Sequence, residues 1–147
     1  GGYVSGSEDL RRFAFNKSST WLLSASHPPP VAAACIAALE VLENEPEHLE
    51  NLWRNTGYFK KGLEEIGFDI GNSPTPITPV IVGESSVAQE MSAMLFEEGI
   101  FALPIVFPMV ARDMARIRTM MNAGHTKVDL DNALASFEKI GRRLRVV

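Results

Sequence analysis

An unusually apolar segment that follows consecutive prolines limits how this chain can fold. Residues 28–30 are all proline, and residues 31–42 are apolar on nearly every side and rich in alanine. Proline is accepted in the first turn of a helix, so the prolines can start one. A helix that is apolar all round must be buried all round. A chain of 147 residues has little room to surround such a helix. We therefore expect residues 31–45 to form a buried connecting helix, covered by another domain or a partner subunit.

Composition excludes several classes of protein. Apolar residues make up 46% and charged residues 22%, which is ordinary for a globular domain. The longest purely apolar run, residues 31–39, is too short to span a bilayer. One cysteine excludes an internal disulfide and a multi-cysteine zinc site, and a net charge of −4 argues against nucleic acid. We expect a cytoplasmic globular protein with no membrane, nucleic-acid or metal partner; no metal-ligand spacing occurs among His27, Cys35, His48 and His125.

The first 26 residues are expected to be short pieces of strand and loop, with one or two helical turns over residues 8–15. Beyond residue 45 the hydrophobic periodicity is clearer, and turn residues separate the segments. It predicts the order helix, strand, helix, strand, strand, helix, over residues 46–66, 77–82, 86–98, 100–106, 115–121 and 126–144. This order predicts an α+β domain: a sheet of about three strands with helices packed on one face.

Local signals set the boundaries of these elements. Gly67 is expected to end the first helix. Pro79 cannot donate to a ladder, which indicates either an edge strand or a position early in a strand. Residues 86–89 match a capping box, with Gly99 ending that helix, and residues 126–129 begin the last helix.

Two arginines share one face of the predicted strand at 115–121. Side chains alternate along a strand, so Ile117 and Thr119 face the helices while Arg116 and Arg118 face away. Arginine binds carboxylates and phosphates bidentately, which favours an anion site. The alternative is a pair of solvated arginines that bind surface acids.

Three other polar features allow a functional and a structural interpretation. Ser24 and Ser26 precede the prolines, where hydroxyls can bind phosphate oxygens but also commonly stabilise turns. His125 lies just before the last helix. It could act as an acid–base group, or it could be a loop residue with a local hydrogen bond. None of the lysines, at positions 17, 60, 61, 127 and 139, has the desolvated context of a Schiff-base lysine.

Five segments, taken in order, resemble the C-terminal part of the α-oxoamine synthases. They are residues 1–7, 24–34, 75–83, 95–101 and 115–126, so the resemblance covers essentially the whole chain. These pyridoxal-phosphate (PLP) enzymes have the aspartate aminotransferase fold (fold type I) and include 8-amino-7-oxononanoate synthase and glycine C-acetyltransferase (2-amino-3-ketobutyrate CoA ligase). The tail at 137–144 is more similar to the glycine C-acetyltransferase branch.

The resemblance implies a C-terminal fragment of a homodimeric enzyme. Residues 1–30 would be the end of the large PLP-binding domain, 31–45 the connecting helix, and 46–147 the small domain. In this family the lysine that holds PLP lies a few residues before the Gly-Gly-Tyr at residue 1, outside the chain. No catalytic residue is then expected here, and the fragment alone should be inactive.

The resemblance also implies roles for residues that are present. Arg118 matches the residue that binds the carboxylate of the amino-acid substrate, and Arg116 would support it. Ser24 and Ser26 match a segment that contacts the PLP phosphate of the partner subunit. The implied reaction condenses an amino acid, with glycine favoured, with an acyl-CoA to give an α-amino ketone or 2-amino-3-oxo acid.

Two departures from the family pattern are His27, where an apolar residue is usual, and Gly124, where alanine is usual. A different class of protein remains as the alternative. It is a free-standing α+β regulatory module that binds an anionic effector through Arg116 and Arg118. An oligomerisation domain without a ligand is a third possibility.

Overall fold

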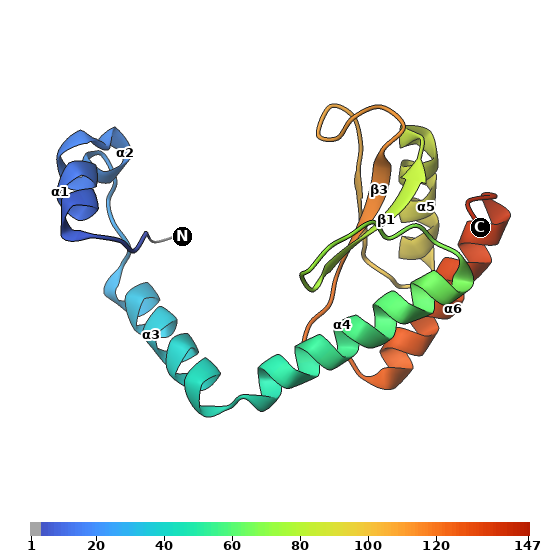
Figure 1. The fold of residues 1–147 in the computed structure, drawn as a ribbon, viewed down its shortest axis with the longest axis horizontal. Coiled ribbons are helices and arrows are strands. Elements are labelled where there is room, and N and C mark those ends of the chain that lie inside the picture. Colours follow the sequence, from blue (N-terminus) through green and yellow to red (C-terminus); the bar gives the residue numbers. More distant parts are fainter. Residues whose placement is uncertain (1–3) are drawn as a thin grey trace. The chain divides into compact units, whose positions relative to one another are not determined.

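The computed structural model describes residues 4–147, and the chain forms two compact units, Gly1–Glu45 and Pro46–Val147 (Figure 1). Each unit is described by itself. No helix among the described residues is both long and apolar enough to cross a membrane.

The first unit consists of the helices α1 (Glu8–Lys17), α2 (Ser19–Leu22) and α3 (Pro29–Asn44). The helical turns predicted over residues 8–15 are confirmed by α1. No strand occurs within residues 4–26, so the expected strand pieces are wrong there, and residues 1–3 lie outside the described residues. Local chemistry explains α1. The Ser7 side chain accepts a hydrogen bond from the Leu10 amide, and the Glu8 carboxylate bonds Arg11 and Arg12 one turn later.

Helix α3 begins with the prolines in its first turn, as expected, and its bounds, Pro29–Asn44, agree with the predicted 31–45 to within two residues. None of its residues is buried within the described chain. Ile36 is 59% exposed and Leu42 54% exposed. The predicted cover for this helix therefore lies outside the described residues, and it stays a prediction.

The second unit has the predicted α+β order. It contains α4 (Glu47–Ile66), β1 (Ile77–Gly83), α5 (Ser85–Glu97), β2 (Leu103–Ile105), β3 (Ala115–Met120) and α6 (Lys127–Arg143). The strands form one antiparallel sheet in the order β1-β3-β2, so the strand with the two arginines is central. The edge position predicted from Pro79 is confirmed.

Two helix boundaries agree with the sequence and one does not. Gly67 caps α4 with φ of 112°, a conformation that glycine adopts without strain. Thr126 and Asp129 form the predicted reciprocal capping box of α6. The capping box predicted at residues 86–89 is wrong: α5 starts one residue earlier, with Glu84 as its N-cap, so the Ser86 hydroxyl lies inside the first turn.

Strand β2 is shorter than predicted, with three residues in place of the whole 100–106 segment. Its Pro104 pairs with Ile117 of β3, and proline has no amide to extend a ladder.

The core of the second unit lies between one face of the sheet and the helices. Ile117 and Val80 on the sheet are fully buried, as is Leu63 of α4. The rings of Phe59 and Phe137 meet edge to face at 5.9 Å, which joins α4 to α6. Helices therefore cover the Ile117 face, and the opposite face of the sheet carries the two arginines.

Candidate anion site on the open face of the sheet

Strand β3 alternates between buried and half-buried side chains. Ala115, Ile117 and Thr119 are buried, while Arg116 and Arg118 are half-buried on the other face. The structure thus brings the two predicted arginines together, because the pleat alternates and the helices cover only one face.

Arg118 lies in the middle of this open face. Its flanking positions are Pro79 on β1 and Leu103 on β2, so apolar residues stand on both sides of it. Its Nε atom is buried and has no hydrogen-bond partner among the described residues. A buried donor without a partner is unfavourable, and a charged one more so. An anionic ligand on this face would supply the missing acceptor.

Arg116 is held differently. Its Nε donates to the main-chain oxygen of Met114 at 3.1 Å, which directs it towards the loop that precedes β3. Neither Arg116 nor Arg118 forms an ion pair with a carboxylate within residues 4–147. The interpretation as arginines paired with surface acids is therefore wrong for the described chain.

Ser24 and Ser26 belong to the first unit and are exposed. The Ser26 amide donates to Ser24 Oγ at 3.1 Å, and Ser26 has a φ of 61°. This tight turn leaves the Ser24 hydroxyl hydrogen free to donate outward, because Ser24 Oγ acts only as acceptor in that bond. The pair fits one part of a phosphate site and also fits an ordinary serine turn.

His125 has local partners, as the structural interpretation expected. Its Nε2 lies 2.9 Å from Nδ2 of Asn122. The buried Asn55 side chain of α4 donates to the main-chain oxygens of Asn122 and His125, at 3.1 Å and 2.9 Å. Sequence reasoning missed Asn55, although a polar residue on the apolar stripe of a helix is a recognisable signal.

Lysines of the second unit have structural contacts. Lys60 donates to the main-chain oxygens of Ser73 and Thr75, and Lys139 binds Glu98. A hydrogen bond to Asp131 raises the pKa of Lys127, the opposite of what a nucleophilic lysine needs.

One cavity of the second unit is separate from the arginine face. It has a volume of about 510 Å³ and lies between α4, α6 and the segment 98–102, with Thr119 and His125 in its wall. Neither arginine lines it. The candidate anion site on the arginine face is therefore distinct from this cavity.

The chain spans less than two fifths of the length of two of its curated relatives. The model of the class I and II aminotransferase family matches residues 1–137. The chain is 54% identical over its whole length to 8-amino-7-oxononanoate synthase from Symbiobacterium thermophilum, covering 38% of that protein. It is 50% identical to the 8-amino-7-oxononanoate synthase/2-amino-3-ketobutyrate coenzyme A ligase of Thermus thermophilus, covering 37% of it.

A solved structure of SPT (serine palmitoyltransferase) with PLP supports the same fold. It superimposes with a TM-score of 0.87 at 23% identity, covering 95% of this chain and 36% of that one. The family match, the full-length alignment and the shared fold lead to one conclusion: this chain belongs to the class I and II aminotransferase family and, within it, to the α-oxoamine synthases.

Proposed function

We propose that the complete protein containing this chain is a PLP-dependent acyltransferase that condenses a small amino acid with an acyl thioester. The observation that carries the proposal is the buried Nε of Arg118, which has no partner among the described residues and faces the open side of the sheet. Relatives with synthase names that align over the whole chain support the same reaction class.

In this proposal Arg118 binds the carboxylate of the amino acid. A guanidinium holds a carboxylate through two parallel hydrogen bonds, which fixes the orientation of the attached Cα. Pro79 and Leu103 lie beside Arg118 on the two neighbouring strands and give that contact apolar neighbours. The contribution of this chain is therefore positioning of the substrate, and no proton transfer is assigned to Arg118.

PLP, when bound, supplies an electron sink for negative charge that develops on the substrate Cα. Exposed Ser24 and Ser26 would donate hydrogen bonds to the phosphate of PLP held by a partner subunit, which makes the working enzyme a homodimer. Residues 1–30 then belong to the large domain and residues 46–147 to the small domain. The apolar surface of α3 would be covered by the large domain and the partner.

Within this reaction class, two pairs of amino acid and acyl donor are candidates. The tail at 137–144 favours glycine with acetyl-CoA, and the second name of the Thermus thermophilus relative refers to a 2-amino-3-keto acid. The name 8-amino-7-oxononanoate describes alanine joined, with loss of carbon dioxide, to a seven-carbon acyl group that ends in a carboxylate. Both amino acids carry the carboxylate that Arg118 would bind.

The test uses the complete open reading frame that contains this chain, purified with PLP. Thiol release from acetyl-CoA with glycine, and from a dicarboxylic acyl-CoA with alanine, separates the two substrate pairs. Arg118→Met should raise the KM of the amino acid by about a hundredfold, while the absorbance of bound PLP stays unchanged. Arg118→Lys keeps the charge but loses the two-pronged geometry, and an intermediate KM is expected.

The proposal fails if the complete protein releases no thiol with either pair, or if Arg118→Met leaves the KM of the amino acid unchanged. This chain alone should show no thiol release, because the lysine that the family uses lies outside it.

A regulatory module remains a second candidate because Pro46–Val147 is a compact unit with its own core. Calorimetric titration of residues 46–147 with inorganic phosphate and with glycine tests it. Tight binding that Arg118→Met abolishes would favour the module; binding only in the complete protein would favour the enzyme.

A further inference from the structure

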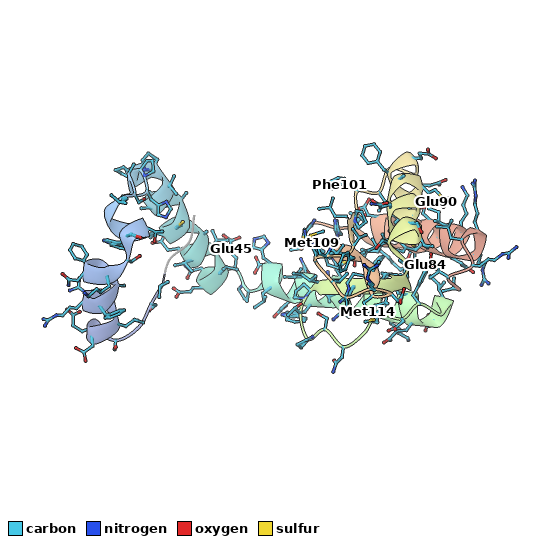
Figure 2. The ribbon with its side chains drawn as sticks, turned by 90° about the horizontal axis from the view of Figure 1, so that it is seen from above. Glu45, Glu84, Glu90, Phe101, Met109 and Met114 are labelled. Carbon is cyan, nitrogen blue, oxygen red and sulfur yellow. The ribbon has the colours of Figure 1, made fainter. Side chains whose placement is uncertain are left out.

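A loop over residues 106–114 joins β2 to β3 and lies beyond the Ala115 end of the arginine strand (Figure 1). Large apolar side chains are exposed along it: Phe107 is 50% exposed, Met109 67% and Met114 40%. Figure 2 labels Met109 and Met114 in the second unit. Clustered apolar exposure of this kind marks a contact surface, and methionine adapts to flexible ligands.

The same loop carries a cation without a carboxylate partner. The guanidinium carbon of Arg112 lies 4.5 Å from the centre of the Phe107 ring, a cation–π contact that fixes its position on the apolar surface. No carboxylate among residues 4–147 forms an ion pair with Arg112, including that of its neighbour Asp113. The loop therefore presents a positive charge beside apolar side chains.

This loop is coupled to the anion site. The hydrogen bond from Arg116 to the main-chain oxygen of Met114 joins the end of the loop to the open face. From Ala115 to Arg118 the strand rises about 10 Å, at ~3.3 Å per residue. A flexible molecule several bonds long, with its reacting end beside Arg118, can therefore reach the loop with its other end.

We propose that Arg112, on the apolar surface formed by Phe107, Met109 and Met114, binds an anionic group at the far end of the acyl donor. This inference rests on the proposed acyl transfer and names a second contact for its acyl substrate. Two parts of a donor have the required chemistry, an anion on a flexible arm. One is a carboxylate that ends the acyl chain, and the other is a phosphate of the coenzyme A carrier.

The experiment measures binding without turnover, in the complete protein and without amino acid. Two non-reactive probes are titrated calorimetrically: coenzyme A, which has phosphates and no acyl chain, and a pantetheine thioether with a carboxylate-ended chain, which has no phosphate. Arg112→Gln should raise the dissociation constant of one of the two probes about tenfold, because it removes one charge-assisted contact. Arg112→Lys should retain most of the affinity, since it keeps the charge.

Arg143→Gln is the matched control, because Arg143 is exposed in the last turn of α6 and lies outside the loop. If Arg112→Gln weakens only the binding of coenzyme A, the contact is assigned to phosphate. If it weakens only the binding of the thioether, the contact is assigned to the carboxylate of the chain. The inference is overturned if the Arg112→Gln variant binds both probes as tightly as the unaltered protein does. It is also overturned if Arg143→Gln weakens probe binding as much as Arg112→Gln does. A protein that binds the probes through Arg112 yet releases no thiol would contradict the proposed function and leave this contact standing.

Discussion

The side-chain amide of Asn55 lies 2.9 Å from the main-chain oxygen of His125, a residue 70 positions further along the chain. The same amide also bonds the main-chain oxygen of Asn122, so both of its hydrogens are used. Helix α4 is thereby attached to the turn that ends the arginine strand and begins α6. The buried amide bonds the main-chain oxygen of His125 and shares that of Asn122 with the His125 amide, which lies 3.5 Å away.

Replacing Asn55 by leucine should destabilise the second unit by about 1–3 kcal/mol, because the main-chain oxygen of His125 loses its donor and that of Asn122 keeps only the long bond from the His125 amide. Urea denaturation followed by circular dichroism measures the change. Arg54→Leu, at the exposed neighbouring position, should change the free energy of unfolding by less than about 0.5 kcal/mol. Equal effects of the two variants would show that the Asn55 hydrogen bonds contribute nothing specific.

Arg118→Met should leave the free energy of unfolding unchanged or raise it by about 1 kcal/mol, because it removes a buried donor without a partner. The neighbouring Ile117→Ala should lower it by about 2–5 kcal/mol, since it opens a cavity in the core. Thermal and urea unfolding of both variants measure this contrast. Strong destabilisation by Arg118→Met would mean that the guanidinium is structural.

Two glycines of the second unit should respond in opposite ways to alanine. A Cβ on Gly141 of α6 would lie 2.5 Å from Cζ of Phe68, so Gly141→Ala should destabilise by about 1–3 kcal/mol through overpacking. Gly57 of α4 has nothing within 4 Å of its Cβ position, and Gly57→Ala should stabilise by about 0.5–1 kcal/mol through helix propensity. Thermal unfolding of both variants checks the signs, and a stabilising Gly141→Ala would contradict the tight packing of α6 on Phe68.

The first turn of α6 should become less stable at acid pH. Hydrogen bonds from the Thr126 side chain and amide lower the pKa of Asp129 below its ordinary value of 3.8. A carboxyl whose pKa is lowered by folding stabilises the folded state above its unfolded pKa, and this contribution is lost as the pH falls through the lowered value. The protection factors of the first-turn amides of α6, which are the intrinsic hydrogen-exchange rates divided by the observed ones, should therefore fall below pH 3.8.

Asp129→Asn is the matching variant for this acid effect, because its amide does not titrate in that range. The protection factors of its first-turn amides, which are corrected for the intrinsic exchange rate, should not change between pH 6 and pH 3. If the variant and the unaltered protein show the same acid response, the response comes from another group, such as Asp131, whose pKa Lys127 also lowers.

Much of the second unit could be predicted because its signals are local. The order of its elements follows from the spacing of apolar residues, and the alternation along β3 places Arg118 opposite Ile117 whatever the rest of the chain does. Gly67 and Thr126 end and begin their helices through contacts within a few residues. The helical turns predicted over residues 8–15 are confirmed by α1, which depends on the local contacts of Ser7 and Glu8.

Other features depend on residues that are distant in the sequence. The apolar pattern over 100–106 did not show that only Leu103–Ile105 pairs with β3. No motif marked Asn55 as the anchor of a turn 70 positions away. The loop position of Arg112 above Phe107 likewise carries no sequence signature.

The sequence by itself determined the kind of elements, their order and which side chains share a face, because these depend on backbone periodicity and near neighbours. Only the tertiary structure decided which charged groups lack a partner. Whether the guanidinium of Arg118 meets a carboxylate is a property of the residues that folding brings around it. Within residues 4–147 folding places Pro79 and Leu103 on either side of it and leaves its buried Nε donor without a partner.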